Sequence, residues 1–185
     1  QGFVGNIYKG KVTRIAPALQ SAFVEIGLER SAFLHVNDIW YPPIPTEPAA
    51  SPKKNKKILS PGQIINVQVI KDPIGSKGAR LSTQISLTGR LLVYLPQENH
   101  IGISHRISDL EQRDLLKNRL QNLLPPNSQG GFIIRTNALE ASDEDFLRDI
   151  RYLETIWKNI QERASQQAMP GRLYADLNLA QRTLR

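Results

Sequence analysis

The sequence contains no cysteine. This absence excludes disulfides, a thiolate nucleophile and a cysteine-based zinc site, and it favours a cytoplasmic location, where thiols stay reduced. No apolar run reaches the about 18 residues typical of a membrane-spanning helix, so we expect no membrane segment. Glycine-rich phosphate loops are absent too, and no nucleophile has a recognisable partner. We therefore expect no catalytic residue in this chain.

We also expect neither a secretion leader nor a metal site. The chain begins at Gln1 without Met and without a basic-then-apolar segment, so we expect a piece of a longer protein with no secretion signal. His100 and His105 stand five residues apart in a loop-like stretch with no third ligand nearby. The acidic run 143–145 is typical of the first turn of a helix. We expect neither group to bind a metal or another cofactor.

Positive charge is concentrated in one part of the chain. Residues 1–108 contain 13 Lys and Arg against 6 Asp and Glu, whereas residues 109–185 contain 11 of each kind. The first part therefore carries the whole net charge of +7. A one-sided basic surplus is typical of proteins that bind polyanions, because each neutralised phosphate releases counterions. The alternative is a basic surface that only favours solubility.

The first half of the chain has the pattern of a small all-β domain. β-branched segments between Pro and Gly turn signals predict strands at residues 6–16, 21–26, 31–36, 64–71 and 80–86. Five strands in this length predict an OB-type barrel, whose outer face binds oligonucleotides. An insertion rich in proline and lysine, residues 40–60, is expected to be a flexible loop.

From Leu87 onward the pattern predicts a mixed α/β domain, so the fold class is α+β. Buried strands are expected at 91–95 and 132–134. Two helices begin at capping pairs, Ser108 with Glu111 and Ser142 with Asp145. The second helix carries an apolar stripe that we assign to the core: Phe146, Ile150, Leu153, Trp157 and Ile160. Met169, Pro170 and Gly171 end it, and residues 173–185 predict the start of another helix.

Alternation along the strands places two aromatic rings outside the barrel. Phe23 and Phe33 share the polar faces of neighbouring strands, while the residues beside them point into the core. Bases stack on exposed rings with about 1 to 3 kcal/mol each, so the two rings are a candidate single-stranded nucleic-acid site. The same face offers further candidates: Lys9, Lys11, His35, Lys77 and Arg80. The alternative is that the insertion or the second domain covers the rings.

A second candidate is Arg135 with Thr136 at the end of a buried strand. A guanidinium fork and a hydroxyl at one fixed point could grip a phosphate. The alternative is that Arg135 pairs with a helix carboxylate such as Asp149.

Several segments make the sequence resemble a known family. Residues 5–12 (GNIYKGKV), 21–27 (SAFVEIG) and 77–81 (KGARL) closely resemble the bacterial ribonuclease E/G family. Residues 4–6 (VGN), 32–35 (AFLH) and 130–136 (GGFIIRT) resemble its G-type members more than its E-type members. The similarity keeps the same order from about Gly2 to the last residue.

The resemblance implies a domain organisation. Residues 1–83 would form an RNA-binding domain of the ribosomal-protein S-one type, and residues 84–172 a 5′-sensor domain. Residues 173–185 would begin a truncated ribonuclease-H-like subdomain. The Mg2+-bearing nuclease domain, and the Zn2+ link that helps the family form multimers, would lie outside this chain.

The resemblance also implies roles for individual residues. Phe23, Phe33 and Lys77 match positions that contact RNA in the family. A second set matches the positions that hold the 5′-terminal phosphate in the family: Gly89, the backbone of Val93, Arg135 and Thr136. In the family, a further arginine from the nuclease part belongs to the same pocket.

The basic charge, the exposed rings and the family resemblance together predict that this chain is the RNA-binding and 5′-end-sensing portion of a magnesium-dependent endoribonuclease. The parent would cut single-stranded, preferably 5′-monophosphorylated RNA in ribosomal RNA processing and RNA decay, and would be a homo-oligomer. This chain would bind RNA and not cut it. The rival is a free-standing OB-fold RNA-binding protein. A DNA-binding module is a third reading, because stacking and phosphate contacts alone do not separate RNA from DNA.

Overall fold

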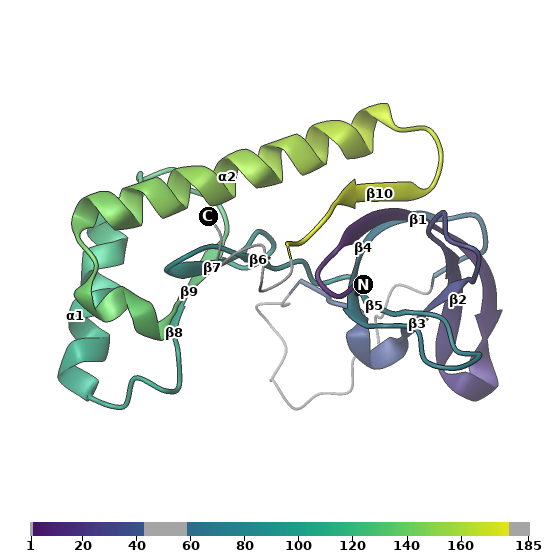
Figure 1. The fold of residues 1–185 in the computed structure, drawn as a ribbon, viewed down its shortest axis with the longest axis horizontal. Helices are drawn as coiled ribbons and strands as arrows, with labels where there is room; N and C mark the ends of the chain where they lie inside the picture. Colours follow the sequence, from purple (N-terminus) through teal and green to yellow (C-terminus); the bar gives the residue numbers. More distant parts are fainter. Residues whose placement is uncertain (1, 43–58, 178–185) are drawn as a thin grey trace. The chain divides into compact units, whose positions relative to one another are not determined.

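The computed structural model describes residues 2–42 and 59–177 (Figure 1). The chain forms two compact units. The first comprises Gln1–Gln84 with Ala164–Arg185, and the second comprises Ile85–Arg163. Most of the predicted insertion, residues 43–58, lies outside the described residues.

The first unit is built on a closed barrel, which confirms the predicted OB-type fold. Its strands are β1 (Ile7–Ala16), β2 (Ser21–Glu25), β3 (Ala32–His35), β4 (Ile64–Lys71) and β5 (Arg80–Ser82). They are hydrogen-bonded in the order β1-β2-β3-β5-β4, and a further pairing of β1 with β4 closes the barrel. Alternate residues fill the interior, among them the fully buried Val12, Val24 and Leu34.

A strand that the sequence did not predict joins this barrel. Residues Gly171–Tyr174 form β10, which pairs antiparallel with Ile7–Lys9 of β1. The helix predicted from residue 173 is therefore wrong at its start, and residues 178–185 lie outside the described residues. Strand β2 pairs with β1 only from Lys11 onward, so the beginning of β1 has a free edge. Pairing at that edge overrides the local helical pattern.

The second unit combines a small sheet with helices. Its elements are β6 (Leu87–Thr88), β7 (Leu92–Leu95), β8 (Ile101–Ile103), α1 (Leu110–Leu123), β9 (Gly131–Ile134), the 3-10 helix η3 (Thr136–Glu140) and α2 (Asp143–Gln166). The strand order is β6-β7-β9-β8, with β8 parallel to β9 and the other pairs antiparallel. The predicted strands at 91–95 and 132–134 are confirmed as β7 and β9.

Both helices begin close to their predicted capping pairs. At α1 the capping side chain is Asp109, whose carboxylate accepts the backbone N–H of Glu111 at 3.0 Å, and not the predicted Ser108. At α2 the predicted pair is confirmed, because Asp145 N–H donates to the Ser142 hydroxyl while Ser142 N–H donates to the Asp145 carboxylate. These bonds from Ser142 lower the pKa of Asp145 below its usual value.

The apolar stripe of α2 lies in the core as predicted. Phe146, Ile150, Leu153 and Ile160 are buried, and Trp157 is half-buried. Asp149 lies on the same stripe and is only 6% exposed. No helix in the described part of the chain is long and apolar enough to cross a membrane.

Candidate nucleic-acid interface

The two aromatic rings singled out in the sequence are neighbours on the barrel. Phe23 of β2 lies directly opposite Phe33 of β3, and both are half-buried. The adjacent pair Val24 and Ala32 is buried, so the rings occupy the outer face of the two strands. The predicted alternation is therefore present, and it places two stacking surfaces side by side.

Lys77 lies beside Phe33, with its Nζ 5.9 Å from the ring centroid. Two features fix this position. The backbones of Ile74 and Lys77 exchange hydrogen bonds of 3.2 and 2.9 Å across a turn. Gly78 then packs so closely on β3 that a Cβ there would stand 2.0 Å from the carbonyl oxygen of Ser31, so only glycine fits.

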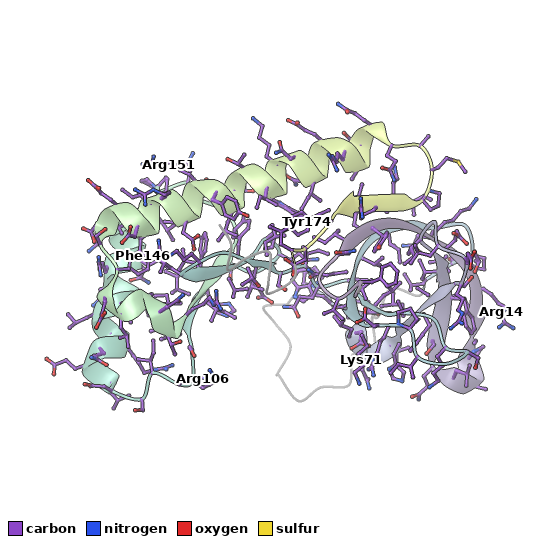
Figure 2. The ribbon with its side chains drawn as sticks, in the orientation of Figure 1. Arg14, Lys71, Arg106, Phe146, Arg151 and Tyr174 are labelled. Atoms are coloured by element: carbon purple, nitrogen blue, oxygen red, sulfur yellow. The ribbon has the colours of Figure 1, made fainter. Side chains whose placement is uncertain are left out.

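A cation that the sequence did not single out covers the other ring. The guanidinium carbon of Arg14 lies 4.6 Å from the centroid of Phe23, within cation–π range, and Figure 2 labels this residue on the barrel surface. A β-bulge creates the contact: Val12 opposes Val24, but Arg14, and not Thr13, opposes Phe23. Strict alternation from Lys11 points to Thr13, so the sequence carries no direct signal for Arg14.

The two predicted cations of β1 differ in their surroundings. Lys9 is half-buried, and its ammonium donates to the carbonyl oxygen of Ala164 at 2.7 Å and to that of Gln167. Lys9 therefore caps the end of α2, a role the sequence did not predict, and its charge is not free for a phosphate. Lys11 is exposed, opposite Glu25.

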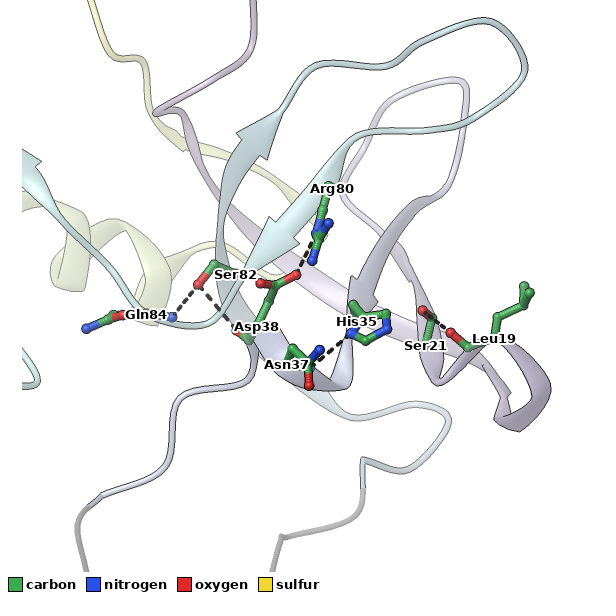
Figure 3. A network of polar contacts seen from close by, with 8 residues as sticks. All are labelled: Leu19, Ser21, His35, Asn37, Asp38, Arg80, Ser82 and Gln84. Carbon is green, nitrogen blue, oxygen red and sulfur yellow. Dashed lines mark hydrogen bonds and ion pairs between the residues drawn. The ribbon is translucent and has the colours of Figure 1, made fainter. Parts of the chain in front are cut away.

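Arg80 of β5 and His35 of β3 each make a polar contact that Figure 3 draws. The Nε of Arg80 donates to the Asp38 carboxylate at 2.7 Å, which neutralises a cation that lies opposite Phe33. The His35 Nδ1 accepts the backbone N–H of Asn37 at 3.1 Å. The Nε2 atom of His35 takes no part in this bond. Of the predicted cations, Lys9 and Arg80 are engaged in contacts within the protein, so the charge of this face is weaker than a count of cations suggests.

In the second unit, a buried carboxylate organises the turn between β6 and β7. Asp149 accepts the backbone N–H groups of Arg90, Leu91 and Leu92 at 3.0, 2.9 and 2.9 Å. A Cβ on Gly89 would stand 2.6 Å from both carboxylate oxygens. Glycine is therefore required at position 89 by the approach of Asp149, and the turn is held by charge-assisted hydrogen bonds.

The structure gathers the predicted phosphate-binding residues around this turn. Arg135 Nη1 donates to the carbonyl oxygens of Gly89 and Arg90 at 2.8 and 3.2 Å. Thr136 follows as the first residue of η3, and Val93 lies in β7 opposite Ile133. The alternative partner of Arg135 is wrong, since no ion pair joins it to Asp149 within residues 2–42 and 59–177. Asp149 binds backbone amides instead.

Arg135 keeps part of its hydrogen-bonding capacity. A guanidinium has five N–H donors, and Nη1 accounts for two of them. The remaining Nε and Nη2 donors have no partner among the described residues, and neither does the Thr136 hydroxyl. These groups are the ones that a bidentate contact with a phosphate requires.

Metal-binding residues are not gathered in the part of the chain that the structure describes. No group of three or more His, Asp or Glu side chains there is arranged to hold an ion. His100 Nδ1 lies 3.6 Å from a carboxylate oxygen of Glu98, which is a surface contact. The described residues therefore do not fit a Mg2+ site.

Two family models match the chain in succession. Residues 2–83 match the S1 RNA binding domain, and residues 86–185 match the ribonuclease E/G family. The first match covers the barrel, and the second contains the turn held by Asp149.

Curated relatives match the same chain as a whole. It is 42% identical to ribonuclease G of Salmonella typhimurium over 193 residues and 44% identical to ribonuclease G of Haemophilus influenzae over 191 residues, covering 100% of this chain in both cases. Ribonuclease E of Synechocystis is 33% identical over 183 residues. The chain spans 38% of the length of the two ribonuclease G proteins and 26% of that of the ribonuclease E protein.

Proposed function

Because this chain belongs to the ribonuclease E/G family, we propose that it is the RNA-binding and 5′-end-sensing part of a single-strand-specific endoribonuclease. The observation that supports RNA binding most directly is the pair of neighbouring, partly exposed rings of Phe23 and Phe33, each flanked by a cation. Aromatic faces accept any unpaired base, and nearby cations neutralise phosphates, so this surface suits single strands.

The activity of the whole enzyme belongs to the same proposal. The parent cleaves single-stranded RNA with Mg2+ in the cytoplasm, serves ribosomal RNA processing and RNA decay, and works as a homo-oligomer. None of the described residues is assigned to the metal. We expect the 185-residue chain alone to leave a labelled single-stranded RNA intact when Mg2+ is added. Cleavage that co-purifies with the chain and stops on adding a chelator would contradict this.

Titration of a fluorescent single-stranded RNA with the 185-residue chain tests the binding surface. Phe23→Ala and Phe33→Ala should each weaken binding by about 1 to 3 kcal/mol, or about 5-fold to 140-fold in Kd, through lost stacking. Tyr152→Ala is the matched control, because Tyr152 is an aromatic residue that is 47% exposed on α2. If both phenylalanine variants bind like Tyr152→Ala, the rings are structural and the proposal fails. DNA of the same sequence, titrated in parallel, measures any preference for RNA.

End sensing is proposed for the turn that Arg135 contacts. The free Nε and Nη2 donors of Arg135 and the hydroxyl of Thr136 hold the 5′-monophosphate, and Asp149 keeps the turn in place. A 5′-triphosphate adds bulk and charge at the point where a monophosphate ends, so the site favours monophosphorylated RNA. A further arginine of the parent would complete the contact.

Cleavage of one RNA with either a 5′-monophosphate or a 5′-hydroxyl, by the complete enzyme, tests the sensor. Arg135→Ala should remove most of the advantage of the monophosphate and leave the hydroxyl-ended rate nearly unchanged. Asn137→Ala is the matched control, because Asn137 Nδ2 also donates to the Arg90 carbonyl, at 2.6 Å, but is not a proposed phosphate ligand. Equal losses in the two variants, or a fall in both rates, would assign Arg135 to structure and not to sensing.

A further inference from the structure

The rings of Phe23 and Phe33 are the centre of a longer row that crosses the barrel. The register places five outward residues opposite one another on successive strands: Arg14 of β1, Phe23 of β2, Phe33 of β3, Arg80 of β5 and Lys71 of β4. The adjoining positions Val24, Ala32, Val69 and Leu81 are buried. The row therefore lies on the outer face of the sheet throughout.

A β-bulge directly precedes the residue at each end of the row. On β1 the pairing shifts between Val12 and Arg14, and on β4 it shifts between Val69 and Lys71. Val12 and Val69 are buried, so strict alternation would turn both Arg14 and Lys71 toward the core. The extra residue turns both side chains outward instead, and both are exposed.

Charge along the row is concentrated at its two ends. Arg80, inside the row, is paired with Asp38 at 2.7 Å. Neither Lys71 nor Arg14 makes a side-chain hydrogen bond or ion pair with any described residue, and the guanidinium of Arg14 lies over the ring of Phe23. Figure 2 labels both on the surface of the barrel. Four strand spacings of about 4.8 Å separate the ends, or about 19 Å along the sheet.

We propose that single-stranded RNA crosses the strands along this row, with bases stacked on Phe23 and Phe33 and with Arg14 and Lys71 holding backbone phosphates at its two ends. The inference rests on the proposed RNA-binding function and adds the path of the strand and two contact residues. Stacked bases carry their phosphates to either side of the rings, where Arg14 and Lys71 lie. A base that stacks on Phe23 takes the place of the Arg14 guanidinium, which is then available to a phosphate.

The salt dependence of binding tests the two ends. For a single strand, the slope of log K against log salt concentration is about 0.7 for each neutralised phosphate. Arg14→Gln and Lys71→Gln should each flatten the slope by about 0.7, and the double variant by about 1.4. Arg14→Lys keeps the charge and should retain the parental slope. Arg172→Gln is the matched control, because Arg172 is an exposed cation on β10 that lies outside the row.

The same titrations separate this inference from the function on which it rests. If Phe23→Ala and Phe33→Ala weaken binding while Arg14→Gln and Lys71→Gln give the slope of Arg172→Gln, RNA binds at the rings but does not follow the row. That result would overturn the inference alone. If neither phenylalanine variant weakens binding, RNA does not bind at the rings, and the proposed function is wrong as well as the inference.

Discussion

The two candidate sites differ in what holds their functional groups in place. On the barrel, aromatic rings and cations project from strands whose opposite faces form the core, and Lys71 and Lys77 make no side-chain hydrogen bond with any described residue. At the turn of the second unit, Arg135 is already bonded to two carbonyl oxygens and Asp149 to three amides. Lys71 and Lys77 can thus be replaced without the loss of a side-chain hydrogen bond to a described residue, whereas Arg135 and Asp149 hold the turn at which we propose phosphate binding.

Removal of the buried carboxylate of Asp149 should have the largest effect on stability. Asp149→Ala leaves three N–H groups without their acceptor, and each buried donor left unpaired costs about 1 to 3 kcal/mol. We expect the free energy of unfolding of the second unit to fall by about 3 kcal/mol or more, measured by urea denaturation. Asp114→Ala, which removes an exposed carboxylate from α1, should change it by less than about 0.5 kcal/mol. A small effect of Asp149→Ala would mean that the turn holds its shape without the carboxylate.

Arg135→Ala should have an intermediate effect on stability. Its Nη1 hydrogen bonds come from a charged donor, but the site is partly exposed, so we expect a loss of about 1 to 2 kcal/mol in the same denaturation assay. Phe23→Ala should lower stability less than Arg135→Ala, since the Phe23 ring lies on the outer face. If Phe23→Ala lowered stability more than Arg135→Ala, the residues of the turn would not be more important for the fold than the rings of the barrel.

The sequence predicts the parts of these sites that follow from a local pattern, and it does not predict those that depend on irregular strand pairing. Period-two alternation is local, so it correctly placed Phe23 and Phe33 outside and Val24 inside. A bulge shifts the period by one residue without a turn signal, so the alternation does not place Arg14 and Lys71 on the outer face. The buried carboxylate did leave a trace, because Asp149 interrupts the apolar stripe next to Ile150.

Strand β10 shows a different limit. Leu177, Ala180 and Leu184 repeat at helical spacing, but Gly171–Tyr174 pairs with a strand more than 150 positions earlier in the chain. Such a pairing depends on the free edge of β1 and leaves no local pattern. The same holds for Lys9, whose role as a helix cap depends on where α2 ends.

Two lysine substitutions should separate the structural cations of the barrel from those proposed to bind RNA. Lys9→Met should lower stability by about 1 kcal/mol, since it removes the cap of α2, and should leave the salt slope of RNA binding unchanged. Lys77→Met should do the opposite, flattening the slope by about 0.7 with little change in stability. Denaturation and salt titration of both variants check this. A flatter slope for Lys9→Met would mean that Lys9 neutralises an RNA phosphate.

The smallest expected effect is a pH dependence at the start of α2. The pKa of Asp145 is lowered in the folded state by its bonds from Ser142, so its stabilising contribution is present above the unfolded pKa of about 3.8 and is lost as the pH falls through the folded value. Asp145→Asn should therefore narrow the stability difference between pH 6 and about pH 3. Urea denaturation at the two pH values measures it, and an unchanged difference would contradict the capping role.

Amide chemical shifts can show whether single-stranded RNA binds along the row that contains Phe23 and Phe33. Titration of the isotope-labelled 185-residue chain with a short single-stranded RNA should shift the amides around Arg14, Phe23, Phe33, Lys71 and Lys77, and leave those of helix α1 unchanged. Arg172 on β10, outside the row, should also stay unchanged. Shifts confined to α1, or shifts on the barrel that avoid both phenylalanines, would mean that RNA does not bind on the rings.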